Sequence, residues 1–479
     1  MAVKNQPILH LPVIIQGGMG VGVSSIEMAR SVANLGHLGV LSGTAIDSVF
    51  ARRLQDGDID GSIRSALKTF PDQECAAEII ERYFLEGGRA ENASYLDVPK
   101  LSLNPTPLAT KLLIVSSYTE VHLAKRGTDG AIGINFLEKI QLATPASIFG
   151  AILAGVDYIL MGAGIPSDIP QLIRDLIDGE KIAFKIKVEG ADETHLLTFD
   201  PSIIQGVDFQ SLHQPTFLAI VSSHILANYL ARDGVTRPDG FVIEGPTAGG
   251  HNAPPRAKDF ITAEGQVAFT ERDLADIEKV KAVGLPFWLA GGYGTPERVK
   301  EALELGANGV QVGSLFALSQ ESGITDDLRE RVLLGLTNGT LQIRTEPKTS
   351  ATRFPFKVVE VNGTASEPEV YEARMRKCDL GYLRSPFLRP DGGVGYRCSG
   401  EPINTFEFKG GTVEETTNVK CLCNALMANI GLGQVRWGNY HEPALLTLGS
   451  DLSGAAELNA LYGGRWTTAN VVEYLTSAI

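Results

Sequence analysis

A recurring unit fills about the first 350 of the 479 residues: a short apolar run rich in β-branched side chains, a glycine- or serine-rich turn, and an amphipathic stretch. This alternation predicts an α/β fold in which helices cover a sheet of parallel strands. Because eight or nine such units fit this length, we expect a closed TIM-type (β/α)8 barrel rather than an open sheet. The predicted strands cover residues 13–16, 39–42, 112–115, 131–136, 156–161, 182–188, 217–221, 240–244, 286–290 and 309–312.

The places where this rhythm is interrupted predict the domain organisation. We expect a barrel over residues 1–355, with insertions at about 48–110 and 189–215, and a C-terminal module of mixed or helical structure over residues 356–479. Two predicted strand ends look alike, since Ser116-Ser117 and Ser222-Ser223 each follow an apolar run and precede an amphipathic stretch. In both places we expect serine to end a strand and cap the next helix.

The composition argues against several classes of protein. Hydrophobic residues make up 44% of the chain, which suffices for a sizeable core and argues against intrinsic disorder. Acidic residues outnumber basic ones by 56 to 42, and the formal charge of −14 argues against nucleic-acid or polybasic membrane binding. No run of 18 apolar residues occurs, the start lacks a secretory pattern, and five cysteines are few for this length. We therefore expect a cytoplasmic protein that binds a small molecule, with homo-oligomerisation left open.

Two glycine-rich turns follow the last two predicted strands. Gly291-Gly292 comes directly after residues 286–290, and Gly313-Ser314 directly after residues 309–312. As the seventh and eighth strands of a barrel, both would end at its carboxyl-terminal face, with bare backbone N–H groups near helix N-termini. Glycine suits this place because a Cβ would keep a phosphate away from the backbone. The turns therefore predict a phosphate site, although tight strand-to-helix connections would explain them as well.

Three further segments place polar groups at the same predicted face. His251 follows Gly249-Gly250 after the strand at 240–244, where two glycines let the backbone approach a planar ligand and an imidazole can abstract a proton. Gln16-Gly17-Gly18-Met19 ends the first predicted strand and combines an amide, open space and a thioether. Asn135 ends another strand. We expect these residues to line a cofactor site with His251 as the catalytic group, the alternative being a structural histidine in a loop.

Taken together, these motifs resemble the FMN-dependent nitronate monooxygenases, also called 2-nitropropane dioxygenases, over roughly residues 10–360. The resemblance rests on Pro12 to Met19, Ala248 to His251, Leu289 to Gly292 and Gly309 to Gly313. The chain departs from the family pattern in two places. Where family members commonly have Gln-x-Pro-Met, this chain has Gln16-Gly17-Gly18-Met19, with Gly18 in place of the proline. Where they commonly have Gly-Thr-Arg-Phe, it has Gly313-Ser314-Leu315-Phe316. The barrel also resembles the flavin-dependent enoyl reductases of polyketide and polyunsaturated fatty-acid synthases.

The resemblance implies FMN at the mouth of the barrel, its phosphate held by the Gly291-Gly292 and Gly313-Ser314 turns, and His251 as the base. It implies oxidation of alkyl nitronates by O2 to a carbonyl compound and nitrite. FMN rather than FAD is expected, because the turns offer one phosphate site. An NAD(P)H-dependent enoyl or quinone reductase on the same barrel is the alternative, and a phosphate-binding barrel without flavin is a third reading.

Four of the five cysteines fall within 46 residues of the C-terminal module, at Cys378, Cys398, Cys421 and Cys423. Four thiolates could enclose a structural Zn²⁺ or an iron–sulfur cluster. The close pair is C-x-C rather than the C-x-x-C of common zinc ribbons, so ordinary buried thiols are the alternative.

Overall fold

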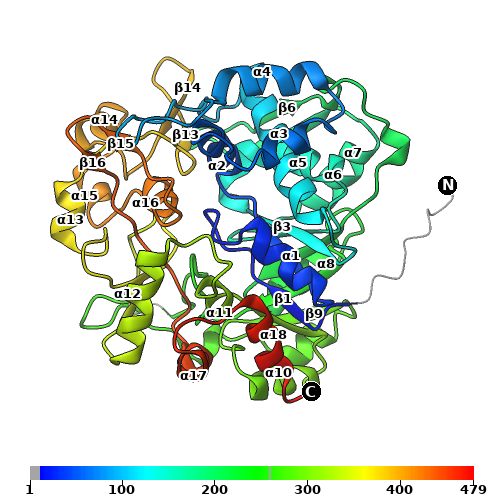
Figure 1. Cartoon of the computed structure of the whole chain (residues 1–479), viewed down its shortest axis with the longest axis vertical. Coiled ribbons are helices and arrows are strands. Elements are labelled where there is room, and N and C mark those ends of the chain that lie inside the picture. Colours follow the sequence, from blue (N-terminus) through cyan, green and yellow to red (C-terminus); the bar gives the residue numbers. More distant parts are fainter. Residues whose placement is uncertain (1–10, 258–259) are drawn as a thin grey trace.

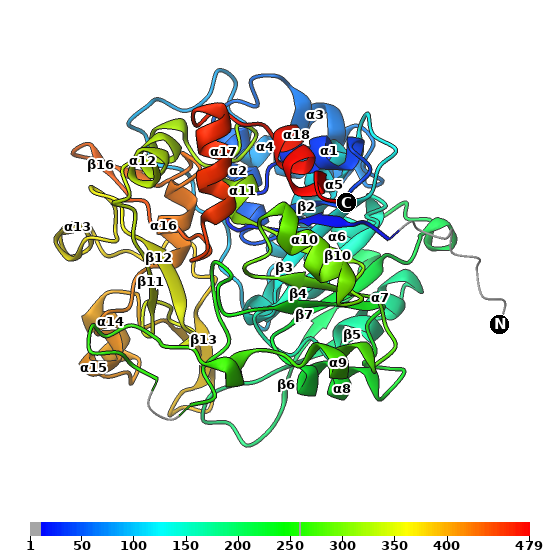
Figure 2. The same cartoon turned by 90° about the horizontal axis from the view of Figure 1, so that it is seen from below.

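The structure is a computed structural model that describes residues 11–257 and 260–479, so the chain start considered for a secretory signal lies outside the described residues. Eight parallel strands pair in the order β1-β10-β9-β8-β7-β4-β3-β2. A further parallel bridge between Ile15 and Leu38 joins β1 to the start of β2 and closes the predicted barrel (Figures 1 and 2). The strands are β1 (Ile14–Gln16), β2 (Gly39–Ser42), β3 (Ile132–Leu137), β4 (Tyr158–Gly162), β7 (Thr216–Val221), β8 (Gly240–Glu244), β9 (Phe287–Ala290) and β10 (Gly309–Val312).

Helices follow the barrel strands along the chain, as the alternating pattern predicts. Side-chain caps begin several of them, for example Ser25 before the first and Thr295 before α10, each accepting a backbone N–H of the first turn. The helices of this part are α1 (Ile26–Asn34), α2 (Ile46–Gln55), α3 (Ser62–Leu67), α4 (Gln73–Tyr83), α5 (Pro107–Lys125), α6 (Thr144–Leu153), α7 (Ile169–Ile177), α8 (His224–Ala231), α9 (Ile277–Lys281), α10 (Pro296–Glu304), α11 (Ser314–Ala317) and α12 (Asp326–Thr337).

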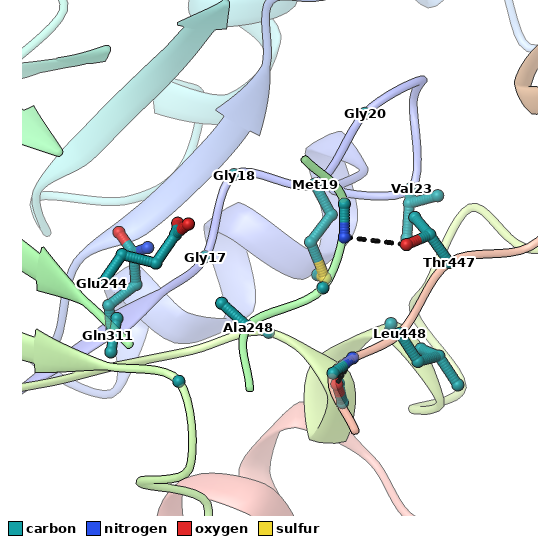
Figure 3. A pocket seen from close by; sticks show the side chains of 18 of the residues that line it. Gly17, Gly18, Met19, Gly20, Val23, Glu244, Ala248, Gln311, Thr447 and Leu448 are labelled. Atoms are coloured by element: carbon teal, nitrogen blue, oxygen red, sulfur yellow. Dashed lines mark hydrogen bonds between the residues drawn. The ribbon is translucent and has the colours of Figure 1, made fainter. Parts of the chain in front are cut away.

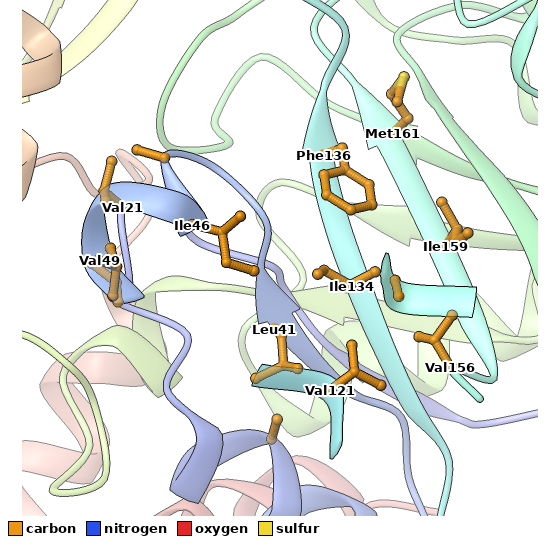
Figure 4. Close-up of a cluster of buried hydrophobic side chains, with 14 of the residues drawn as sticks. Val21, Leu41, Ile46, Val49, Val121, Ile134, Phe136, Val156, Ile159 and Met161 are labelled. Carbon is orange, nitrogen blue, oxygen red and sulfur yellow. The ribbon is translucent and has the colours of Figure 1, made fainter. Parts of the chain in front are cut away.

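The core has two layers, one inside the barrel and one between the barrel and its helices. Trp288 lies fully buried inside the barrel, and its Nε1 donates to the backbone oxygen of Pro12 at 2.7 Å. Outside the barrel, side chains of β2, β3 and β4 such as Leu41, Ile134 and Ile159 belong to one apolar cluster with residues of α2 and α5 (Figure 4). This packing holds the strand ends in place.

The predicted strand at residues 112–115 is wrong, because this segment lies inside α5. Helix α5 is buried on nearly all sides among α1, α2, α3 and α6, so its apolar residues show no helical stripe. A short apolar run in such a helix cannot be told from a buried strand by periodicity. Ser116 therefore caps nothing, and its hydroxyl donates to the oxygen of Leu113 at 3.1 Å. The matching prediction holds at Ser223, whose Oγ accepts the N–H of Leu226 at the start of α8.

The strand predicted at residues 182–188 exists as β5 (Ile182–Ile186) but lies outside the barrel. It pairs in antiparallel fashion with β6 (His195–Phe199), so the polar insertion predicted at 189–215 contains a strand and begins earlier than expected. The alternation of buried and exposed residues along β5 is typical of a strand with one face in solvent. Lys185 and Lys187, which interrupt this apolar segment, are exposed to solvent.

The C-terminal residues form three hairpins and several helices beside the barrel. The predicted boundary after residue 355 falls in the connection of the first hairpin, and the last two helices return to the barrel, where α18 contacts α1 and α10 (Figure 1). None of the helices in the described part of the chain is long and apolar enough to cross a bilayer. The elements are β11 (Ile343–Glu346) with β12 (Phe356–Val359), β13 (Ser385–Leu388) with β14 (Val394–Arg397), β15 (Val435–Arg436) with β16 (Tyr440–His441), α13 (Pro368–Ala373), α14 (Ile403–Phe408), α15 (Val413–Thr416), α16 (Leu422–Ala428), α17 (Ser453–Tyr462) and α18 (Thr468–Thr476).

Candidate active site

A cavity of about 260 Å³ lies at the carboxyl ends of the barrel strands (Figure 3). It brings together residues from five of the strand ends that the sequence analysis selected, although they lie up to 300 positions apart in the chain. Cavities at this face are where barrel enzymes place their active sites. The predicted residues that line it are Gly17, Gly18, Met19, Asn135, Gly249, Gly250, His251, Gly291, Gly292, Gly313 and Ser314.

The two predicted phosphate turns lie on one side of this cavity, after the adjacent strands β9 and β10. Gly291 and Gly292 have φ angles of +79° and +86°, which side chains rarely adopt, and a Cβ on Gly291 would meet the oxygen of Gly245 at 2.8 Å. Among the described residues, the backbone N–H groups of Gly292 and Gly313 have no acceptor. Ser314 Oγ accepts the N–H of Gly449 at 2.9 Å, which leaves its own proton available to a ligand. These donors fit an anionic oxygen.

Asn135 and Gly18 form a second contact zone at the end of β3. The side-chain nitrogen of Asn135 donates to the oxygen of Gly18 at 3.1 Å, and a Cβ on Gly18 would lie only 2.2 Å from Asn135 Cβ. The amide oxygen of Asn135 is buried without a protein partner, as are Thr247 Oγ1 and Gln311 Oε1. All three residues line the cavity. Buried polar atoms without partners are costly unless a ligand or water satisfies them, so they fit a ligand rich in N–H and O–H groups.

Gln16 does not line the cavity, contrary to the prediction that it contacts a ligand. Its side chain is fully buried, with Nε2 donating to Ser24 Oγ at 2.8 Å and Oε1 accepting the N–H of Val40 at 2.9 Å. Ser24 Oγ in turn accepts the N–H of Met19 and donates to the oxygen of Gly17. Gln16 and Ser24 therefore shape the turn that faces the cavity.

His251 lines the cavity, and its ring contacts Phe356 edge to face with centroids 4.9 Å apart. Its Nε2 lies 2.7 Å from Ser350 Oγ. Ser350 Oγ also accepts the backbone N–H of Thr352 and is hydrogen-bonded to the hydroxyl of Thr352. Burial lowers the pKa of His251 to about 4, and the positive charge of Lys139 adds to this effect. The imidazole is therefore neutral at pH 7, so it can donate a hydrogen bond but is a weak base.

Glu244 and Gln311, at the ends of β8 and β10, close the cavity at the end opposite Leu448 (Figure 3). Burial raises the pKa of Glu244 to about 7, and the positive charge of Lys357 opposes this rise. Lys357 Nζ is buried beneath the cavity and donates to Thr345 Oγ1 at 2.8 Å. Gln311 lies in one of the quoted motifs and Glu244 ends the predicted strand at 240–244, but nothing local indicated that their side chains line the cavity.

Residues from the C-terminal part also line the cavity, which sequence reasoning missed. They come from α16 and from the chain between β16 and α17, and no glycine or histidine motif marks them. The set is Leu426, Asn429, Leu446, Thr447, Leu448, Gly449 and Asp451.

The predicted metal site of the four late cysteines is not formed. The thiols do surround one small cavity of about 10 Å³, yet no group of three or more His, Cys, Asp or Glu residues in the described chain could hold a metal ion. Burial raises the pKa of Cys421 to about 11 and also raises that of Cys398, so both are protonated thiols near neutral pH. All five cysteines are free.

Comparison with known proteins gives one family. Residues 117–353 match the model of the nitronate monooxygenase family. A Bacillus subtilis (strain 168) protein called "Probable nitronate monooxygenase" is 34% identical over 95 residues, which are 20% of this chain and 26% of that relative's length. The chain therefore spans about a quarter of that relative.

Two solved structures resemble the chain in fold only. FabK from Thermotoga maritima has a TM-score of 0.49 and 15% identity, and the match covers 98% of this chain and 93% of the FabK chain. A nitroalkane oxidase from Streptomyces ansochromogenes has a TM-score of 0.44 and 12% identity, covering 98% and 96%.

The matched residues 117–353 include the barrel strands β3 to β10 and the turns of Gly249-Gly250, Gly291-Gly292 and Gly313-Ser314 in the glycine-lined cavity. Over this part of the chain, the protein is similar to the nitronate monooxygenase family.

Proposed function

We propose that this protein binds FMN and oxidises alkyl nitronates with O2, so that two nitronate anions and one O2 give two carbonyl compounds and two nitrites. The observation that carries this proposal is the neutral His251 in a cavity that is also lined by the glycine turns of Gly291-Gly292 and Gly313-Ser314. An imidazole with a pKa of about 4 is poorly suited to removing a proton from carbon at neutral pH. A nitronate needs no such removal, because it is already the anion.

The residues around the cavity fit a flavin mononucleotide. Gly291, Gly292, Gly313 and Ser314 would hold its single phosphate through neutral donors, and the unpaired acceptor atom of Gln311 would take an N–H or O–H of the ligand. When bound, FMN would supply a two-electron acceptor that can pass electrons to O2.

The chain's own groups then position the nitronate. His251, held by Ser350 through Nε2, would donate a hydrogen bond from its other ring nitrogen to a nitro oxygen. Glu244, with a pKa of about 7, is largely protonated below neutrality and then adds no negative charge beside an anion.

Two measurements on the purified flavoprotein test the proposal. Mass spectrometry of the released cofactor should give FMN, and FAD or no flavin would contradict it. Anaerobic mixing with an alkyl nitronate should bleach the flavin absorbance rapidly, whereas NADPH should not. Bleaching by NADPH alone would instead assign the enoyl or quinone reductase activity.

His251→Asn tests the role of the imidazole, with the exposed His441→Asn as the matched control. If His251 removes protons, kcat/KM for the neutral nitroalkane should fall by about 10²–10⁴, and that for the preformed nitronate much less. Since the imidazole is a weak base, we expect similar losses on both substrates. No loss on either would remove His251 from the site.

A further inference from the structure

The segment of residues 446–451 lies directly against the glycine turns of the cavity (Figure 3). Thr447 Oγ1 accepts the N–H of Gly250 at 2.7 Å, and the N–H of Ser450 donates to the oxygen of Thr247 at 2.9 Å. Together with Leu426 of α16 we call this segment the C-terminal wall. It is part of the cavity lining although it lies about 200 residues beyond the histidine turn.

The C-terminal wall is held tightly in this position. A Cβ on Gly249 would lie 2.8 Å from the backbone of Leu448, and a Cβ on Gly449 would lie 2.8 Å from the oxygen of Thr247. On its other side, the oxygen of Leu446 accepts the N–H of Val359 at 3.0 Å. Backbone contacts this close leave no room for the wall to shift by a side-chain's width, so it has a definite shape against which a ligand can be selected.

The chemical character of the cavity changes along its length. Leu426, Leu446 and Leu448 of the wall line the cavity together with the apolar side chains of Met19 and Val23. Glu244 and Gln311 lie at the end away from Leu448 (Figure 3). Within residues 11–257 and 260–479, no arginine or lysine lines the cavity.

We propose that the C-terminal wall determines substrate specificity by accommodating an uncharged aliphatic chain carried by the substrate. This inference rests on the proposed function, since it takes the cavity to be the site of nitronate oxidation. Burying a methylene against such a wall is worth about fourfold in affinity. A carboxylate at the end of the same chain would find no arginine or lysine in the described lining to compensate its charge.

Steady-state kinetics with a series of primary alkyl nitronates test this specificity. From ethyl to hexyl nitronate, kcat/KM should rise about fourfold per added methylene until the cavity is filled. An ω-carboxylate of matched length should lose at least about tenfold. Leu426→Asn should flatten the dependence on chain length, whereas Leu461→Asn, at a residue 66% exposed on α17, should leave it unchanged. A wild-type enzyme indifferent to chain length, or one that prefers the carboxylate, would overturn the inference.

A binding measurement separates this inference from the proposed function. Unreactive primary alcohols of increasing length should perturb the flavin absorbance of the holoenzyme, with Kd falling about fourfold per methylene, even if no nitronate is oxidised. Leu426→Trp should abolish the binding of the longest alcohols first. If Leu426→Asn instead releases FMN and keeps the chain-length dependence, the wall holds the flavin and the inference fails.

Discussion

The carboxyl group of Glu244 provides a direct test of the electrostatics of the cavity. Burial raises its pKa from 4.5 to about 7, so the folded protein keeps a proton that the unfolded chain releases above pH 4.5. The stabilisation of the protonated form is therefore fully present below pH 4.5 and is lost as the pH rises to about 7. Above that pH the group is ionised in both states, and its contribution no longer changes.

The magnitude follows from the two pKa values. The difference between 4.5 and about 7 corresponds to about 3 kcal/mol at about 1.4 kcal/mol per pKa unit. About 2 kcal/mol of this falls between pH 5 and pH 8, because the unfolded chain is already largely ionised at pH 5. Glu244→Gln keeps the shape of the side chain but does not titrate. In a chain of this length, the melting temperature of the variant minus that of the wild type should increase by about 2 °C from pH 5 to pH 8.

The assay is thermal unfolding of the flavin-free protein across this pH range, followed as the difference between variant and wild type. His251 ionises near its ordinary pKa of 6.5 in the unfolded chain, whereas burial holds its pKa at about 4 in the folded protein, and because it is present in both proteins its effect cancels. In a Lys357→Met background the gain should extend to higher pH, because removing the positive charge raises the pKa of Glu244 further. A difference that stays constant from pH 5 to pH 8.5 would refute a buried, proton-holding Glu244.

Two further predictions concern the cavity turn and the late cysteines. Gly18→Ala adds a Cβ that would collide with Asn135, so it should weaken FMN binding by about tenfold in a fluorescence titration. Gly234→Ala is the control, because no atom lies within 4 Å of its added Cβ. Equal FMN affinities of the two variants would contradict the close approach of Gly18 and Asn135. The half-buried thiols of Cys398 and Cys421, whose pKa values are raised, should react slowly with a thiol reagent at pH 8 in the native protein, and all five thiols should titrate after denaturation without reductant. Zinc or iron in a stoichiometric amount in the purified protein would contradict the conclusion that these thiols are free.

The parts of the fold and site that could be predicted have local physical causes. The strands before Gly291 and Gly313 are mostly apolar because both faces of a barrel strand are buried. The glycines are needed where the backbone turns at positive φ or approaches another chain segment. Since parallel strands of a barrel end at one face, their terminal residues meet there whatever their distance in sequence. That rule was enough to bring Asn135 and His251 to the same cavity.

The errors arise where packing over long distances decides the structure. Helix α5 shows no amphipathic stripe because neighbouring helices cover it on all sides, so its residues 112–115 look like a buried strand. Gln16 turns away from the cavity because its amide binds Ser24 and the backbone of Val40, partners that no local pattern identifies. The positions of the cysteine side chains likewise depend on how three separate segments meet.

The two parts of the cavity lining are encoded differently in the sequence, and this bears on how specificity can change. The glycine turns directly follow barrel strands, so their chemistry is encoded in short motifs around Gly291 and His251. The C-terminal wall is joined to these turns by hydrogen bonds between distant segments, from Gly250 to Thr447 and from Gly449 to Ser314, in which no leucine side chain takes part. Changes in the leucines of the C-terminal wall can therefore alter which substrate fits without disturbing the turns that would hold the cofactor.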